Sequence, residues 1–234
     1  LKEELVPATG CTEPVAIAYA AAAAKKALGC EPEVCEAELS GNIIKNARCV
    51  AVPNTGGLKG IEAAVAAGVV AGRAELALDV LSSASGREEE IRDFLEKRGV
   101  SVRPADNDLT FFIRVTVGAG SSRAKAVIEG FHTNLVLIEK DGRELFRSGA
   151  KSNPCCVADR SMLTVEKIVE FADVADLDEI REILERQIAF NSAISEEGLK
   201  GDWGANVGKV ILKTFGDSPE SRLKAVAAAG SDAR

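Results

Sequence analysis

The chain has 234 residues, of which 46% are hydrophobic and 28% are charged, and its formal net charge is −7. This balance is typical of a folded globular protein and excludes a disordered chain. No stretch concentrates Lys and Arg, which argues against nucleic-acid binding. The longest apolar run has 11 residues, from 14 to 24, and a membrane span needs about 20.

The first hundred residues predict a helix-rich region. Thr12 can cap a helix, Glu13 suits its positive end and Pro14 fits its first turn, so a helix is expected over residues 12–28. Gly29 ends it, and its apolar residues lie all round, as in a buried helix. Further helices are predicted at residues 60–72, 75–81 and 87–98. Strands are predicted at residues 34–39 and 49–52. Polar, turn-rich segments follow these strands or lie between them, at residues 40–46 and 53–57.

The pattern then changes to short β-rich runs separated by turns, of which Asp141-Gly142 is the strongest hairpin signal. The runs predict a four-strand antiparallel meander over residues 109–117, 124–129, 135–139 and 144–147. Amphipathic helices follow at 165–172 and 177–190. We therefore expect an α+β fold, with apolar Ala-rich helices and amphipathic helices around a central antiparallel meander. The expected organisation is one unit over residues 1–234, with a helix-rich part (1–100), the meander (101–150) and a helical part (160–234).

Six cysteines stand at positions 11, 30, 35, 49, 155 and 156. They fit no zinc pattern, because no two are spaced as C-x-x-C and the chain has a single His. A chain of this size without a visible secretory signal does not depend on disulfides. We expect reduced cysteines and a cytoplasmic protein.

Cys11 is the first candidate for chemistry, because it directly precedes a predicted helix. The helix dipole lowers the pKa of a thiol there, and the thiolate can attack or bind a soft metal. The alternative is a small buried Cys before a capped helix. Two polar segments form a second candidate, since their amides and hydroxyls could hold a small carboxylate. The residues concerned are Asn42, Lys45, Asn46, Asn54 and Thr55, and ordinary turn chemistry is the alternative for each.

A third candidate is the segment at 191–204, which contains Ser195, Glu197 and the only Trp. Its alternative is a helix C-terminus with a packed Trp.

His132 lies in a predicted turn between strands. It is the only side chain in this sequence whose ordinary pKa suits proton transfer near pH 7. Tyr19 or Lys45 could serve as base only with a strongly depressed pKa. The alternative for His132 is a structural turn residue.

The sequence Thr9-Gly10-Cys11-Thr12-Glu13-Pro14, followed by an Ala-rich helix, resembles the opening of the L-cysteine desulfidase family. That family is similar to the α-chain domain of iron–sulfur L-serine dehydratases. The resemblance continues through residues 42–46, 52–56, 130–134 and 195–201 and reaches Ser231-Asp232-Ala233-Arg234. It spans the whole chain but only about half of a family member. We therefore expect the N-terminal portion of a longer enzyme whose C-terminal half is missing.

The resemblance implies a lyase that converts L-cysteine to pyruvate, ammonia and hydrogen sulfide by β-elimination. It also implies a 4Fe–4S cluster in the full-length protein, with Cys11 as one ligand and the others in the missing half. We therefore expect the cluster to be absent from this chain, and the isolated chain to be inactive. The alternatives are an iron–sulfur L-serine dehydratase and a non-catalytic ligand-binding or scaffold module that lacks the cluster.

Within this interpretation, His132 is the expected base and Lys45 a second catalytic candidate. Asn42, Asn46, Asn54, Thr55 and Ser195 are expected to bind the substrate, with Glu13 or Glu197 on its amine. Cys11, both amide-rich segments and a turn at residues 195–198 should then converge on one polar cleft. The expected partners are a small amino acid, the missing half and further copies in a homo-oligomer, with no nucleic acid and no membrane.

Overall fold

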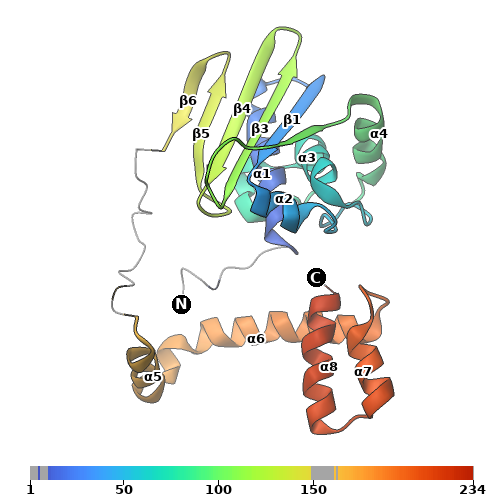
Figure 1. The fold of residues 1–234 in the computed structure, drawn as a ribbon, viewed down its shortest axis with the longest axis vertical. Helices are drawn as coiled ribbons and strands as arrows, with labels where there is room; N and C mark the ends of the chain where they lie inside the picture. Colours follow the sequence, from blue (N-terminus) through green and yellow to red (C-terminus); the bar gives the residue numbers. More distant parts are fainter. Residues whose placement is uncertain (1–4, 6–9, 149–160, 162, 234) are drawn as a thin grey trace. The chain divides into compact units, whose positions relative to one another are not determined.

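The computed structural model describes residues 5, 10–148, 161 and 163–233. Its contacts divide into two compact units, one of Ala8–Ser152 and one that combines Leu1–Pro7 with Asn153–Arg234. Helices cover a mixed sheet in the first unit, whereas the described part of the second is built from helices (Figure 1). The predicted α+β class is therefore confirmed.

The first unit is organised around one six-stranded sheet with the order β2-β1-β3-β4-β5-β6. Four consecutive strands form the predicted antiparallel meander, and β1 pairs antiparallel with the first of them. The short β2 pairs with β1 in parallel, so the sheet is mixed. The strands are β1 (Val34–Leu39), β2 (Ser101–Pro104), β3 (Phe112–Ala119), β4 (Ser122–Glu129), β5 (Leu135–Lys140) and β6 (Arg143–Arg147).

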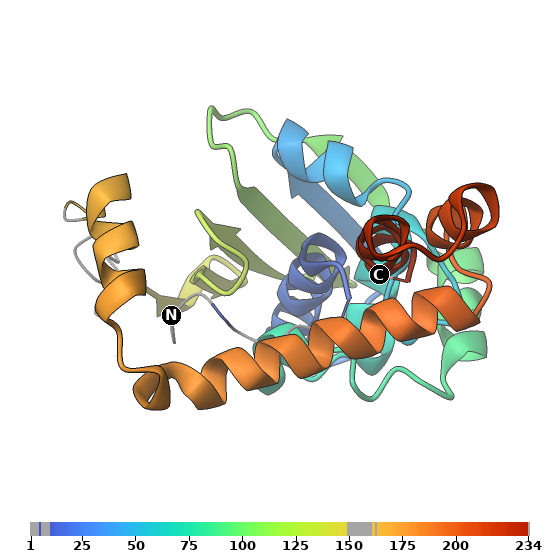
Figure 2. The same cartoon turned by 90° about the horizontal axis from the view of Figure 1, so that it is seen from below.

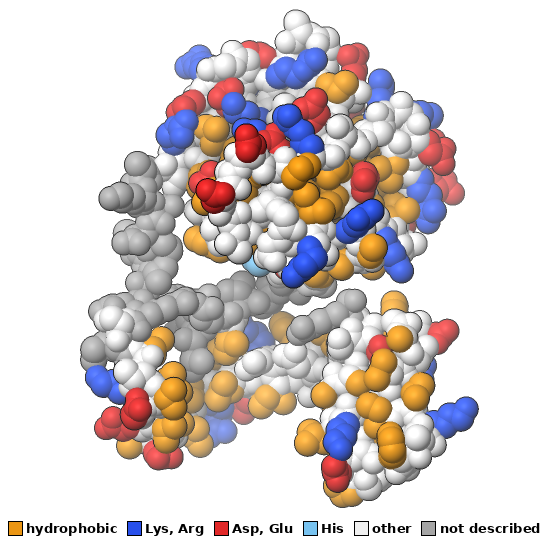
Figure 3. Space-filling view, viewed as in Figure 1, with side chains coloured by type: hydrophobic (Ala, Val, Ile, Leu, Met, Phe, Trp, Pro, Cys, Tyr) orange, Lys and Arg blue, Asp and Glu red, His pale blue; other side chains and the backbone are white. Residues whose placement is uncertain are grey.

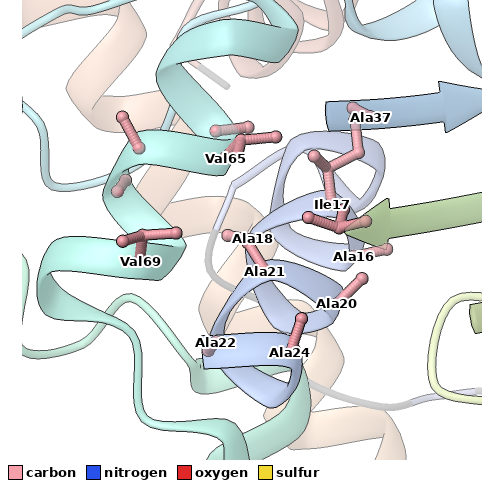
Figure 4. Packing of buried hydrophobic residues seen from close by; sticks show 14 of the residues in the cluster. Ala16, Ile17, Ala18, Ala20, Ala21, Ala22, Ala24, Ala37, Val65 and Val69 are labelled. Atoms are coloured by element: carbon pink, nitrogen blue, oxygen red, sulfur yellow. The ribbon is translucent and has the colours of Figure 1, made fainter. Parts of the chain in front are cut away.

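Two Ala-rich helices, α1 (Thr12–Leu28) and α3 (Gly60–Ala71), form the core of this unit with one face of the sheet. α1 contacts α3 on one side and β3 and β4 on the other. Figure 4 shows small α1 side chains, such as Ala18 and Ala21, facing Val65 and Val69 of α3. Alanine leaves room for the two helix backbones to approach closely, and the composition of α1 explains why it is buried nearly all round.

The boundaries of these two helices were predictable from local signals. α1 begins at Thr12 as expected, although the N-cap position is Cys11 rather than Thr12. Gly29 ends it with a left-handed φ of 83°. The amphipathic helix predicted before the meander is α4 (Glu88–Arg98), with Ile91 buried. The predicted helix at 75–81 is a short 3-10 helix, η1 (Ala74–Asp79).

Two expectations for the segment between β1 and α3 were wrong. Residues 40–46 do not form a turn-rich loop, because they build helix α2 (Gly41–Ala47). Ile43 and Ala47, one helical turn apart, are both fully buried, and this burial outweighs the turn preference of the polar residues around them. Residues 49–52 do not form a strand either, since only Ala51 makes an isolated bridge, to Lys59.

The second unit contains α5 (Val165–Val174), α6 (Leu177–Lys200), α7 (Val207–Phe215) and α8 (Pro219–Asp232). α6 is longer than the predicted helix at 177–190, and Figure 2 shows it as one continuous rod. The turn expected at residues 195–198 is therefore wrong. Gly198 lies inside α6, where a Cβ would overlap the Ala229 carbonyl of α8, so this glycine allows two helices to approach closely rather than ending one.

The helices of the second unit leave many large apolar side chains exposed, and Figure 3 shows several of them in orange. The most exposed are Val165, Val174, Leu177, Ile188, Phe215 and Leu223. Even so, no helix among the described residues combines the length and the apolar character that a membrane crossing requires.

Candidate functional site

The candidate site is centred on the carboxylate of Glu13, in the first turn of α1. Its Oε2 accepts hydrogen bonds from the Cys11 thiol at 3.1 Å and from the Thr12 hydroxyl at 3.4 Å. Helix formation explains this arrangement, because Cys11 occupies the N-cap and Thr12, Glu13 and Pro14 form the first turn of α1 behind it. An acidic side chain is also favoured at this positive helix end.

Asn46 brings helix α2 to the same carboxylate. Its Nδ2 donates to Glu13 Oε1 at 3.2 Å, so the two carboxylate oxygens have donors from two different helices. α2 is positioned at its other end by Ser40, which is buried. The Ser40 hydroxyl donates to the Thr110 carbonyl at 2.9 Å, which fixes α2 against the segment that leads into β3.

His132 reaches this cluster from the turn between β4 and β5. The Gly130 amide donates to the Phe111 carbonyl at 3.1 Å, and the Asn134 side chain closes the turn by donating to the Glu129 carbonyl at 2.8 Å. The Phe111 ring packs edge-on against the imidazole, with 4.7 Å between ring centroids. Within the described part of the chain, the buried His132 Nε2 has no hydrogen-bond partner.

Glu13 and His132 influence each other's protonation. Burial lowers the pKa of His132, and the negative charge of Glu13 opposes this only in part. Burial alone would raise the pKa of Glu13, but the hydrogen bonds from Cys11 and Asn46, with the nearby His132, lower it overall. At neutral pH the site therefore holds a carboxylate and a neutral imidazole.

The loop at residues 53–57 packs against the same end of α1. Gly10 has a left-handed φ of 72°, and a Cβ there would lie 2.7 Å from Pro53 Cγ. The loop's own polar groups stabilise its backbone: the buried Thr55 hydroxyl donates to the Val52 carbonyl at 2.7 Å, and Asn54 Nδ2 donates to the Leu81 carbonyl at 3.1 Å. Both residues thus have a structural role, and their predicted contact with substrate stays a prediction.

The two remaining α2 candidates, Asn42 and Lys45, are exposed. Asn42 stands four residues before Asn46, so it lies one helical turn away on the face that carries Asn46. Lys45 directly precedes Asn46 in the sequence. Neither side chain takes part in the described hydrogen bonds of the Glu13 cluster. Substrate contact by Asn42 and Lys45 therefore stays a prediction.

Ser195 and Glu197 belong to the second unit. The Glu197 carboxylate accepts a hydrogen bond from the Trp203 indole at 3.1 Å, beside the end of α6. Ser195 faces α8, since a Cβ at Gly230 would lie 2.8 Å from its hydroxyl oxygen. Both side chains therefore have contacts within the helical unit.

The described residues do not fit a 4Fe–4S cluster on their own. Such a cluster needs three thiolates at one place, and the described residues contain no group of three or more His, Cys, Asp and Glu side chains that could hold a metal ion. Cys35 is buried in β1, and burial raises the pKa of its thiol to about 12. Cys30 follows the opposite end of α1, about 25 Å along the helix from Cys11. Cys155 and Cys156 lie outside the described residues.

Two residues of this site carry no chemical signal in the sequence. Phe111 is an ordinary apolar residue before a strand, and its contact with His132 depends on the pairing of β3 with β4. Ser40 belongs to a polar segment that was expected to form a turn. Its role as the anchor of α2 became visible only with the helix in place.

Comparison with known proteins gives relatives without an assigned activity. The chain is 48% identical over 236 residues to a UPF0597 protein of Desulfitobacterium hafniense, matching 100% of this chain and 55% of that protein. It is 38% identical to a UPF0597 protein of Fusobacterium nucleatum and 43% identical to one of Lachnoclostridium phytofermentans, covering 57% and 56% of those proteins. The chain thus spans about half the length of the curated relatives it matches. No family model matches it, and no solved structure does.

Proposed function

We propose that this chain is part of a lyase that eliminates hydrogen sulfide from L-cysteine. The observation that carries the proposal is the Glu13 cluster, which joins three segments that are far apart in the sequence: residues 10–14, α2 and the turn at 130–134. These are segments on which the resemblance to L-cysteine desulfidases rests. A thiol, a carboxylate and a neutral imidazole gathered at one helix end also suit proton-transfer chemistry.

His132 is the proposed base for the α-proton. A neutral imidazole with an unpartnered Nε2 can accept a proton near pH 7, and its lowered pKa keeps it neutral there. The nearby carboxylate of Glu13 then stabilises the imidazolium that forms. Because both Glu13 oxygens already accept hydrogen bonds from protein donors, we assign Glu13 to positioning rather than to binding the substrate amine.

The elimination breaks the Cα–H and Cβ–S bonds of L-cysteine and forms a Cα=Cβ double bond. The proton goes to His132 and the electron pair of the Cβ–S bond leaves with hydrosulfide, which takes up a proton to become hydrogen sulfide. The aminoacrylate tautomerises to an imine, and one water molecule converts it to pyruvate and ammonia. Asn42 and Lys45, on the exposed face of α2, are the proposed contacts of the substrate carboxylate.

A cluster would require ligands that the described residues do not supply. Cys11 remains the candidate ligand from this chain, and any others would lie outside the described residues or in the part of longer relatives that this chain does not span. We place the reaction in the cytoplasm, supported by the exposed Cys30 and Cys49 thiols. The predicted homo-oligomer and missing half stay predictions.

The test uses a chimera, because the relatives are longer than this chain. This chain replaces the matched 236 residues of the Desulfitobacterium hafniense protein, and the purified chimera is assayed anaerobically for sulfide and pyruvate. L-Cysteine should yield both products in equal amounts. His132→Ala should reduce turnover by about 10² or more, whereas Glu96→Gln, on the exposed side of α4, should not.

L-Serine is the second substrate to assay, since the same proton removal with a hydroxyl leaving group gives pyruvate without sulfide. Faster turnover of L-serine would reassign the chain to the serine dehydratases. No product from either amino acid, in a folded chimera and in the unaltered relative, would contradict the proposal and favour a non-catalytic module.

A further inference from the structure

A cavity of about 340 Å³ opens in the first unit, away from Glu13, between α1 and the β5–β6 hairpin. Its floor is a single stripe of α1 residues at positions i, i+4, i+7 and i+8: Tyr19, Ala23, Lys26 and Ala27. Ala23 leaves the stretch between Tyr19 and Lys26 shallow, and Ala27 lies just beyond Lys26. The larger Tyr19 and Lys26 are about 10 Å apart along the helix axis.

The wall opposite this stripe is apolar and only partly covered. Leu135 and Ile138 of β5 line it together with Leu145 and Phe146 of β6, whose exposed fractions are 53% and 45%. The pairing of β5 with β6 shifts register beside Ile138, so Leu145 is an extra residue in the β6 edge strand. Leu145 and Phe146 thereby both contribute to the cavity.

Among the described residues that line the cavity, the charged side chains are Lys26 and Glu75, which lie beside each other. Lys26 Nζ lies 3.7 Å from Glu75 Oε2, which is beyond hydrogen-bond distance, and both side chains are more than half exposed. Arg73 Nε donates to the other Glu75 oxygen at 3.3 Å. Two cationic groups therefore share one carboxylate, which leaves net positive charge beside the mouth.

At the opposite end, Tyr19 presents a neutral hydroxyl. Burial raises the pKa of this phenol, so it stays protonated at physiological pH. No hydrogen bond among the described residues involves it.

We propose that this cavity binds a small unbranched carboxylic acid, with its carboxylate at Lys26 and its apolar chain along Ala23 toward Tyr19. The volume of this cavity lies in the range of small-molecule sites, and its lining is apolar with a few polar groups, as in such sites. The length of the ligand follows from the distance between Tyr19 and Lys26. Its negatively charged head group follows from the excess of positive charge at the mouth of the cavity. The site is separate from the Glu13 cluster and independent of the proposed lyase activity.

The test is isothermal titration calorimetry of the 234-residue chain with sodium octanoate, with n-octylamine as a probe of equal length and opposite charge. Octanoate should bind saturably at one site, and octylamine should not. Ala23→Phe should abolish binding by filling the groove. Lys26→Gln should weaken binding about two- to fivefold, as expected for an exposed ion pair. The matched control is Lys25→Gln, since Lys25 pairs with Glu31 and does not line the cavity.

Glu75→Gln distinguishes a site for carboxylates from a site for amines most sharply, because it removes the carboxylate that competes with the ligand for Lys26. It should tighten octanoate binding, whereas a site for amines would lose affinity. Circular dichroism of each variant checks that it remains folded, and Lys26→Gln keeps the test valid if Ala23→Phe does not fold. The proposal would be overturned if octanoate did not bind saturably or if octylamine bound equally well. It would also be overturned if sedimentation showed a dimer that Phe146→Glu dissociates. That result would mean that a second copy of the chain covers this face.

Discussion

The side-chain amide of Asn46 donates to the carboxylate of Glu13 at 3.2 Å, across 33 residues of sequence. This contact fixes the end of α2 against the beginning of α1. Because the same carboxylate accepts from Cys11 and lies close to His132, it organises the candidate site. Its loss should therefore change both stability and the electrostatics of the imidazole.

Asn46→Ala should destabilise the chain by about 1 kcal/mol, because a partly buried carboxylate loses a hydrogen-bond donor. Asn42→Ala is the matched control on the same helix. Its side chain is exposed, and alanine is the better helix former, so its effect should stay within about 0.5 kcal/mol. Urea unfolding followed by circular dichroism measures both. Equal effects of the two substitutions would mean that the Asn46–Glu13 bond contributes nothing.

Gly10→Ala should cost more stability than Gly57→Ala. Both glycines have a left-handed φ, of 72° and 85°, so alanine is strained at either position. Only at Gly10 would the new methyl meet Pro53, whereas nothing lies within 4 Å at Gly57. The excess cost should be about 1 kcal/mol or more, and it should shrink when both variants are made in a Pro53→Ala background. An excess that persists without Pro53 would locate the strain elsewhere.

Gly68→Ala should be among the most destabilising small substitutions in the first unit. A Cβ there would overlap the backbone carbonyl of Ala18, so α1 and α3 would have to separate along their shared interface. A loss of about 3 kcal/mol is expected from overpacking of two buried helices. Gly41→Ala, in α2 with open space around it, should instead be neutral or stabilising. Thermal unfolding of the two variants in parallel would show whether they differ in this direction.

Stability should fall in two steps on acidification. Folding lowers the pKa of His132, so the unfolded chain binds that proton more readily and the free energy of unfolding decreases as pH falls below about 6.5. Folding also lowers the pKa of Glu13, and its contribution is present above about 4.5 and lost below. His132 is the only histidine. His132→Gln should thus flatten the upper step and leave the lower one, and an unchanged upper step would contradict this assignment.

The parts of the fold that the sequence predicted are those with strong local signals. Thr12, Glu13 and Pro14 marked the start of α1, and Asp141-Gly142 marked the hairpin between β5 and β6. The parts that it could not predict depend on tertiary contacts. The short strand β2 forms only because β1 offers a parallel partner, and α2 forms because Ile43 and Ala47 have a core to enter.

The candidate site was predictable in its residue types but not in their connections. Cys11, Asn46 and His132 could be chosen for their chemistry and were expected near one cleft, but the sequence does not indicate that the Glu13 carboxylate is the group that lies near all three. Glu13 was expected to hold a substrate amine, whereas its hydrogen bonds to Cys11 and Asn46 favour a positioning role. Gly198 lies in the segment that was expected to form a turn, and its close approach to α8 accounts for a glycine inside the helix.

The proximity of Glu13 to His132 is tested most directly by the pKa of the imidazole, measured by proton NMR. The chain has one histidine, so a single set of imidazole resonances reports it without assignment. The wild-type pKa should lie below 6.5, and Glu13→Gln should lower it further, because the carboxylate is the charge that favours the imidazolium. Glu96→Gln, on α4, should leave it unchanged. A pKa that does not respond to Glu13→Gln, or rises, would contradict the site described above.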